Sequence, residues 1–304
     1  GYDAHITGSS NPEDIKDSDV IIITAGVPRK PGMNREDLLG INIKIITDVA
    51  NNVKEYAPDA FVIVVSNPLD AIVYSFYKVS GFDKSKVIGM AGALDSGRFR
   101  TFLAMETGYS VQDVHCMVLG GHGDTMVPIS RLATVGGVPV TSLIGSDKLK
   151  EIEDRTRKAG GEIVKLFGNG SAYYAPAACA IEMAESYLKD KKRVIPSAAL
   201  CEGEFGVDGY FIGVPAVIGS GGIEKILEFK LFPHEQKMLN NTLRKEIVDL
   251  IVRGKGGHIP SAFSIVDIVN TIYDKILKYN LANPDDEKRD YFVLSKGHGC
   301  VALY

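Results

Sequence analysis

Two uninterrupted apolar runs constrain the fold of this chain most strongly. The first covers residues 20–23 and is followed by Thr-Ala-Gly, and the second covers residues 61–65 and is followed by Ser-Asn-Pro. Continuous apolar runs of this length are typical of parallel strands that are covered on both faces. Between them, apolar residues recur at helical spacing over residues 36–56, and Pro58 ends the pattern. This alternation predicts a doubly wound α/β sheet, in which ligands bind at the carboxyl ends of the strands.

The middle of the chain predicts a different layer. Residues 115–128 indicate a strand that runs into a glycine-rich turn, and residues 148–167 and 176–190 favour helices. Two further strands, joined by an Asp-Gly turn, are expected over residues 194–219. The sequence ILEFKL favours one more strand, and residues 4–7 near the start of the chain favour a short strand. We therefore expect an α+β part after the opening α/β part, with a boundary near residue 114.

Composition and charge exclude several classes of function. Lys and Arg number 34 against 38 Asp and Glu, and this near balance argues against a nucleic-acid or anionic-membrane partner. Polar residues and a proline interrupt the longest apolar stretch, at 61–76, so no membrane-spanning helix is predicted. The 4 cysteines are far apart and show no metal-ligand spacing, and no secretory leader opens the chain. A reduced, cytoplasmic protein without a metal site is expected.

Three polar segments offer candidate chemistry, and each has a purely structural alternative. In GGHGD, His122 lies between glycines that let a ligand approach, although such a turn can simply require positive φ. In LDSGRFR, Asp95 and Arg98 share a helix face, either as a surface ion pair or as an orienting carboxylate beside an arginine that binds a substrate carboxylate. In GVPRKPGMNRED, Arg29 and Arg35 lie in a basic loop or in a lid that closes over an anion.

Together and in this order, these motifs resemble the lactate/malate dehydrogenase family. ITAGVPRKPGMNREDLL, VVSNPLDA, LDSGRFRTF and GGHGDTMVP are the matching segments, and the resemblance extends over residues 1–231. More narrowly, the chain is similar to bacterial malate dehydrogenases that are close to lactate dehydrogenases. The resemblance implies a Rossmann-type sheet followed by a substrate domain.

The resemblance also implies roles for the substrate-site residues. His122 would accept the hydroxyl proton as hydride leaves the substrate, and Asp95 would orient its imidazole. Arg98 would bind the C1 carboxylate, and Arg35 would polarise the substrate carbonyl. Arg29 would neutralise a second carboxylate, which favours malate and oxaloacetate over lactate and pyruvate.

Four residues match positions that contact the cofactor NAD in the family. Asn67 would touch both cofactor and substrate, and the other contacts would come from Asn42, Val65 and Ser66. The family's GxGxxG turn is not found in the chain, and the unit that carries it would precede Gly1. We therefore expect this truncated chain to bind NAD poorly and to turn over little, and micromolar binding in an NADH fluorescence titration would contradict this. The choice between NAD and NADP stays open, since the deciding residue would also precede Gly1.

The tail resembles another family. RGKGGHIPSAFS and RDYFVLSKGHGCVALY are similar to the start of a transketolase thiamine-diphosphate-binding region. This resemblance implies that His258 and His298 contact thiamine diphosphate or substrate. The later metal motif and the activating Glu of that family are not found in the chain, so thiamine diphosphate binding is not expected.

These inferences combine into one set of predictions. The fold is a truncated doubly wound Rossmann-type α/β sheet, an α+β substrate domain and a partial, mostly helical transketolase-like tail. The function is that of an NAD-dependent malate dehydrogenase of the tricarboxylic acid cycle, impaired by the truncation, in a cytoplasmic homo-oligomer. Its partner is a small dicarboxylic 2-hydroxy or 2-oxo acid. Alternatives are a lactate dehydrogenase, a non-catalytic chimeric remnant and a thiamine-dependent transketolase fragment. The expected domains are an incomplete dinucleotide-binding domain at 1–113, a catalytic domain at 114–240 and the tail at 241–304.

Overall fold

The computed structural model describes residues 3–27, 35–168 and 171–242. Its α-helices are α1 (Arg35–Tyr56), α2 (Leu69–Ser80), α3 (Ala91–Thr107), α4 (Ser146–Phe167) and α5 (Tyr174–Leu188), and residues 233–242 are also helical. The strands are β1 (Val20–Ile23), β2 (Phe61–Val64), β3 (Val87–Gly89), β4 (Val114–His115), β5 (Val118–Gly120), β6 (Met126–Pro128), β7 (Thr134–Val135), β8 (Val138–Pro139), β9 (Arg193–Glu202), β10 (Asp208–Gly219) and β11 (Gly222–Ile226). Single turns of 3-10 helix are η1 (Pro12–Ile15), η2 (Lys84–Lys86), η3 (Val111–Asp113), η4 (Ser130–Leu132), η5 (Val140–Ser142) and η6 (Glu204–Gly206).

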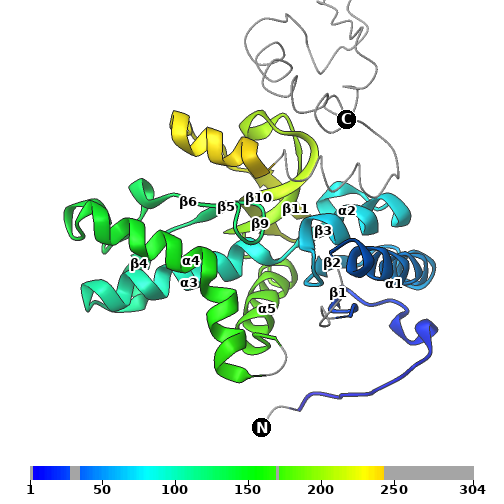
Figure 1. Ribbon diagram of the computed structural model, residues 1–304. Coiled ribbons are helices and arrows are strands. Elements are labelled where there is room, and N and C mark those ends of the chain that lie inside the picture. The colour runs from blue at the N-terminus through cyan, green and yellow to red at the C-terminus, as the bar shows by residue number, and fades with distance from the viewer. Residues whose placement is uncertain (1–2, 28–34, 169–170, 243–304) are drawn as a thin grey trace, which may run out of the picture.

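One mixed sheet spans both the opening and the middle parts of the described chain. Its strands lie in the order β1-β2-β3-β9-β10-β5-β6, and β11 pairs with β10 (Figure 1). The pairs β1–β2 and β2–β3 are parallel, whereas the pairs from β3 to β6 are antiparallel. A small antiparallel sheet, β4-β7-β8, lies beside α3 and α4. The predicted α/β sheet followed by an α+β layer is confirmed.

The apolar run in β2 is buried because helices cover both faces of the sheet. Val62 and Val64 pack with α1 and α2 on one face, whereas Phe61 and Ile63 pack with α5 on the other. All four side chains are completely buried. Burying apolar side chains of this size stabilises the fold by roughly 1.5–3 kcal/mol each.

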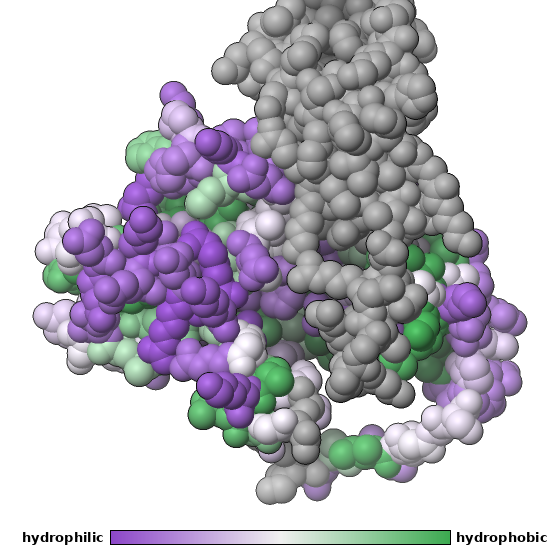
Figure 2. Space-filling model, viewed as in Figure 1, coloured by the Kyte–Doolittle hydropathy of each residue, from purple (hydrophilic) through white to green (hydrophobic). Residues whose placement is uncertain are grey.

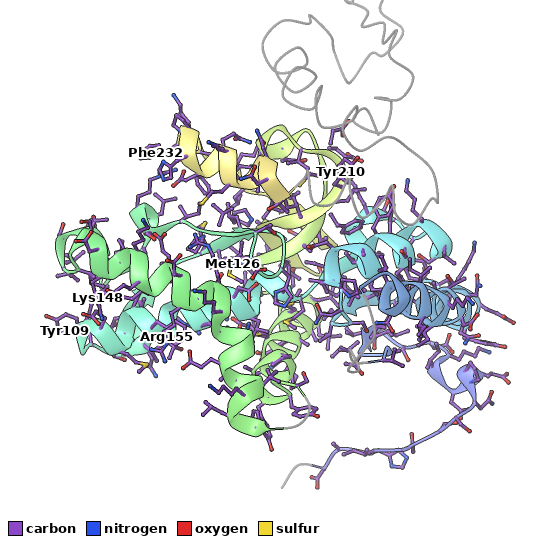
Figure 3. The ribbon with its side chains drawn as sticks, in the orientation of Figure 1. Tyr109, Met126, Lys148, Arg155, Tyr210 and Phe232 are labelled. Atoms are coloured by element: carbon purple, nitrogen blue, oxygen red, sulfur yellow. The ribbon has the colours of Figure 1, made fainter. Side chains whose placement is uncertain are left out.

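Two further clusters fill the second half of the molecule. One lies between α3, α4 and the β5–β6 hairpin and contains Met126, which is labelled in Figure 3. The other joins β9 and β10 to the helix at 233–242 through Leu239. The part of the sheet formed by β9, β10, β5 and β6 is therefore covered by α3 and α4 and by that last helix.

Four local predictions from the sequence were wrong in detail. Residues 3–9 form no strand, because no described strand pairs with them, and Ile6 is 87% exposed. β1 is less covered than its sequence suggests, with Ile22 42% exposed, because it lies at the edge of the sheet. The 3-10 turn η6, rather than Asp208–Gly209, joins β9 to β10. The strand expected in ILEFKL ends at Ile226.

The surface over α4 is polar. Figure 2 shows a hydrophilic area there, formed by charged side chains that pair along the helix, such as Arg155 with Glu162 and Arg157 with Asp154. None of the helices in the described part of the chain has the length and apolar character needed to cross a membrane.

Candidate active site

The turn of the β5–β6 hairpin carries His122. Gly120 and Gly123 have φ values of +84° and +120°, which side chains rarely adopt, so the glycines of GGHGD are needed for the turn itself. Strands β5 and β10 approach each other closely at the base of the hairpin, since a Cβ on Gly213 of β10 would lie 2.5 Å from the carbonyl oxygen of Gly120. This close approach fixes the base of the hairpin. The turn therefore presents the imidazole from a rigid base.

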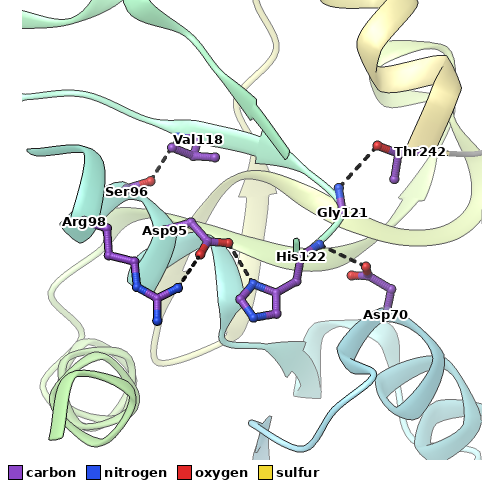
Figure 4. A network of polar contacts seen from close by, with 8 residues as sticks. All are labelled: Asp70, Asp95, Ser96, Arg98, Val118, Gly121, His122 and Thr242. Atoms are coloured by element: carbon purple, nitrogen blue, oxygen red, sulfur yellow. Dashed lines mark hydrogen bonds and ion pairs between the residues drawn. The ribbon is translucent and has the colours of Figure 1, made fainter. Parts of the chain in front are cut away.

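A buried carboxylate faces that imidazole. Asp95 lies in α3, is 2% exposed, and places Oδ2 2.8 Å from Nδ1 of His122 (Figure 4). One turn later in α3, the guanidinium of Arg98 donates to Oδ1 of Asp95 over 3.3 Å. The structure thus brings together three of the residues that the sequence singled out.

The geometry fixes the proton arrangement of His122. A carboxylate can only accept, so Nδ1 must carry a hydrogen and the neutral ring keeps its lone pair on Nε2. Burial of the ring works against the charged form, but the charge and hydrogen bond of Asp95, helped by Asp70, outweigh it and raise the pKa of His122 above its usual value. The side chain stays 22% exposed, which leaves access for a small reactant.

Residues that the sequence did not single out hold the His122 turn by its backbone. Oδ2 of Asp70, in the first turn of α2, accepts from the His122 N–H over 3.2 Å. The hydroxyl of Thr242 lies 3.5 Å from the N of Gly121 and donates to the carbonyl of Thr125 over 3.0 Å. Asp70 does stand in the motif VVSNPLDA, but its contact partner lies 52 residues further along the chain, and no local pattern reveals it.

The carboxyl ends of β1 and β2 form the edge that faces this turn in the fold. Asn42 of α1 is 2% exposed and joins the two loops, since its side chain accepts from the Val27 N–H over 2.8 Å and donates to the Asn67 carbonyl over 2.9 Å. The hydroxyl of Ser66 donates to the carbonyl of Ala25 over 2.6 Å. Asn67 itself is exposed, and the bond between it and Pro68 is cis.

The remaining residues singled out from the sequence are placed as follows. Val65 continues from β2, and its N–H donates to the carbonyl of Ile23 over 2.8 Å. Arg35 is the first residue of α1, and within this helix the structure describes side chains from Leu39 onward. Arg29, His258 and His298 lie outside the described residues.

Other features of the described residues are separate from this site. A cavity of about 270 Å³ lies beside α3, and its lining includes Gly97, Arg100 and His115 but neither His122 nor Asp95. No group of three or more His, Cys, Asp and Glu side chains in the described ranges is arranged to hold a metal ion.

Comparison with known families decides the identity of this arrangement. Residues 2–89 match the lactate/malate dehydrogenase NAD binding domain, and residues 92–253 match the lactate/malate dehydrogenase alpha/beta C-terminal domain. The chain belongs to the lactate/malate dehydrogenase family. Residues 235–304 match the transketolase thiamine diphosphate binding domain, so the resemblance predicted for the tail is also confirmed.

Individual members of the family are similar over most of the chain. The malate dehydrogenase of Rhodopirellula baltica is 57% identical over 243 residues, which are 80% of this chain and 77% of that protein. The malate dehydrogenase of Myxococcus xanthus is 56% identical over 253 residues, or 83% of this chain and 81% of the relative. This degree of identity supports the predicted malate dehydrogenase type of oxidoreductase.

Solved structures of family members share the fold. Malate dehydrogenase from Salinibacter ruber has a TM-score of 0.80 at 47% identity, covering 84% of this chain and 81% of its own. Lactate dehydrogenase from Cryptosporidium parvum, complexed with lactic acid and nicotinamide adenine dinucleotide, has a TM-score of 0.77 at 47% identity, covering 81% and 79%. The predicted Rossmann-type fold is therefore confirmed.

The described residues fit one end of NAD. At the carboxyl edge of β1 and β2, a Cβ on Gly26 would lie 3.3 Å from Oδ1 of Asn42, so the turn after β1 is closed tightly onto α1. The side chains of Ser66 and Asn42 hydrogen-bond to backbone groups of this edge and stabilise it. Asn67 is exposed beside them. Such an edge is where doubly wound sheets bind nucleotides. The fit concerns the nicotinamide side, since the chain contains no GxGxxG sequence for the pyrophosphate.

Proposed function

We propose that this chain interconverts malate and oxaloacetate. The observation that carries the proposal is the 2.8 Å contact between Nδ1 of His122 and the buried carboxylate of Asp95, at the end of a glycine turn. It provides a base of fixed tautomer for the substrate hydroxyl. The names of the relatives at 56–58% identity support malate as the substrate.

This geometry determines which atom of His122 accepts the substrate proton. When bound, NAD supplies the acceptor for the hydride that leaves C2 of malate. Nε2 of His122 accepts the proton of the C2 hydroxyl, and the ring becomes an imidazolium, which Asp95 stabilises across Nδ1. In the reverse direction the same Nε2–H donates to the oxygen of oxaloacetate as the hydroxyl forms.

Arginines account for recognition of a dicarboxylate. Arg98 is only 13% exposed and uses one N–H on Asp95, which leaves its other donors for the C1 carboxylate. By the family resemblance, Arg29 neutralises the distal carboxylate and Arg35 polarises the reacting carbonyl. Asn42, Val65, Ser66 and Asn67 line the nicotinamide side, with Asn67 also touching substrate.

The remaining features of the proposal are predictions from the sequence. The protein acts in the cytoplasm, as a homo-oligomer, with domain boundaries near residues 113 and 240. No role in thiamine diphosphate binding is proposed for His258 or His298.

The decisive test compares substrates in the wild-type chain, in Arg29→Gln and in His122→Asn. Because the chain contains no GxGxxG sequence for the pyrophosphate, we expect slow NAD-dependent malate oxidation, and His122→Asn should reduce it further, by about 10²- to 10⁴-fold. Arg29→Gln should lower the preference for oxaloacetate over pyruvate by roughly 10- to 100-fold, because one charged hydrogen-bonded contact is lost. An unchanged preference would remove Arg29 from the specificity site.

A lactate dehydrogenase is the second candidate. The 47% identity to the lactate-bound Cryptosporidium parvum enzyme favours it. Faster reduction of pyruvate than of oxaloacetate by the wild-type chain would establish this alternative in place of the first.

A further inference from the structure

A second carboxylate contacts the His122 turn from a different element. Asp70 stands in the first turn of α2, two residues after the Asn67–Pro68 bond, and its Oδ2 accepts from the backbone N–H of His122 over 3.2 Å. Figure 4 shows Asp70 and Asp95 on opposite sides of His122, one at its backbone and the other at its ring. The two contacts therefore restrain different parts of the same residue.

The contact leaves little freedom to the turn. A Cβ on Gly121 would lie 3.3 Å from Oδ2 of Asp70 and 2.8 Å from both Oγ1 of Thr125 and Cγ2 of Thr242. The carboxylate thus packs directly against the glycine that precedes His122. A glycine is required at this position mainly because Thr125 and Thr242 lie so close to it, and Asp70 of α2 leaves little further room.

Among the side chains that the structure describes, three charged ones face His122 from the elements packed around it. Asp95 and Arg98 come from α3, and Asp70 comes from α2. The charge of Asp70 acts in the same direction as that of Asp95 and favours the imidazolium, whereas the guanidinium of Arg98 opposes it. Asp70 therefore contributes charge as well as a hydrogen bond.

We propose that Asp70 is a positioning residue that ties the catalytic His122 to the loop before α2 and adds a second negative charge beside the imidazolium. The inference rests on the proposed role of His122 as the acid–base group. Since Asn67 and α2 are continuous in sequence, Asp70 connects the loop assigned to substrate and nicotinamide with the turn assigned to the proton. The hydrogen bond from the His122 N–H to Asp70 is then one of the contacts that set the distance between these two parts of the site.

The variant Asp70→Asn separates charge from packing, because the amide oxygen can still accept from the His122 N–H while the negative charge is removed. Asp147→Asn is the matched control, since Asp147 also stands in the first turn of a helix, α4, but is exposed and far from His122 in the fold. Asp95→Asn provides the reference for loss of the charge that faces the ring directly.

The measurement is an NMR titration of the imidazole of His122 in the full chain, with His122→Asn used to assign its signal among the 6 histidines. We expect Asp70→Asn to lower the pKa of His122, Asp95→Asn to lower it further, and Asp147→Asn to leave it unchanged. A value in Asp70→Asn equal to that of the control would overturn the proposal. The readout needs no turnover, so a chain that lacks malate activity refutes the proposed function without touching this result.

Kinetics give the second readout. In Asp70→Asn, the pH profile of malate oxidation should move to lower pH, and kcat should fall roughly tenfold with little change in KM, because the lost charge weakens the imidazole as a base and leaves substrate binding unaffected. If the variant does not fold, the His122 amide proton of the wild-type chain should shift as Asp70 is protonated in acid. A His122 amide signal that does not shift as Asp70 is protonated would contradict the hydrogen bond between them.

Discussion

At the scale of single residues, the site depends on a buried carboxylate whose effect changes with pH. Asp95 is almost fully buried, and its charge and hydrogen bond overcome the effect of burial so that the pKa of His122 is raised. A histidine whose pKa is higher in the folded chain than in the unfolded chain stabilises the fold below the unfolded value, near ~6.5. That stabilisation is lost as the pH rises through the folded value.

The variant Asp95→Asn tests whether the carboxylate stabilises the fold more at low pH than at high pH. Its loss of unfolding free energy relative to wild type should be larger at about pH 5.5 than at about pH 9, because only the charged imidazole benefits from the carboxylate charge. Urea denaturation at the two pH values measures the difference. The lost charge beside the guanidinium of Arg98 adds an offset that does not depend on pH, so an equal loss at both values would refute the coupling.

At the scale of elements, the crossing of β5 and β10 sets the position of the His122 turn. Gly213→Ala would place a Cβ 2.5 Å from the Gly120 oxygen, and the strands must then separate. We expect a loss of about 1–3 kcal/mol in stability from overpacking, and a fall in kcat of at least roughly tenfold from the displaced turn.

Chemical denaturation and malate oxidation measure both effects of Gly213→Ala. The matched control is Gly161→Ala in α4, where a Cβ would meet no atom within 4 Å. This control should be neutral or slightly stabilising, since alanine favours helix over glycine. Equal behaviour of the two variants would show that the crossing does not control the site.

Local patterns predicted the elements well where each pattern is self-sufficient. The 22 residues of α1 carry their own helical periodicity and a proline shortly after the end, and β2 carries a run that is typical of a doubly covered strand. Residues 3–9 and Ile22 differ, because strand pairing and coverage depend on neighbours that local sequence does not describe. The contact of Asp95 with His122 could be predicted only through the family motifs, and the contact of Asp70 depends on the three-dimensional approach of α2 to the β5–β6 turn.

At the scale of the whole molecule, the helix at 233–242 packs against β9 and β10 and covers that part of the sheet. Arg131 donates to Oε1 of Glu235 over 2.9 Å and to Oε2 over 3.1 Å, and Glu235 is 3% exposed. The same guanidinium lies over the ring of Phe232, 4.1 Å from its centroid, near the position labelled in Figure 3. This cluster attaches the last described helix to the rest of the fold.

Glu235→Ala should therefore destabilise the molecule by about 3 kcal/mol, because it leaves a partly buried guanidinium without its carboxylate. Thermal and urea unfolding provide the measurement. Glu151→Ala is the control, since its pair with Lys148 is exposed on both sides and should contribute less than about 1 kcal/mol. A change in Glu235→Ala no larger than in this control would mean that the helix is held by apolar contacts alone.

The contact between Thr242 and the His122 turn has a consequence for synthesis on the ribosome. The polypeptide is made from its amino end, so His122, Asp95 and Asp70 all emerge long before residue 242. The His122 turn cannot form its hydrogen bonds with Thr242 until that residue has left the exit tunnel of the ribosome. A nascent chain released before that point would contain every residue assigned to chemistry and still lack the finished turn.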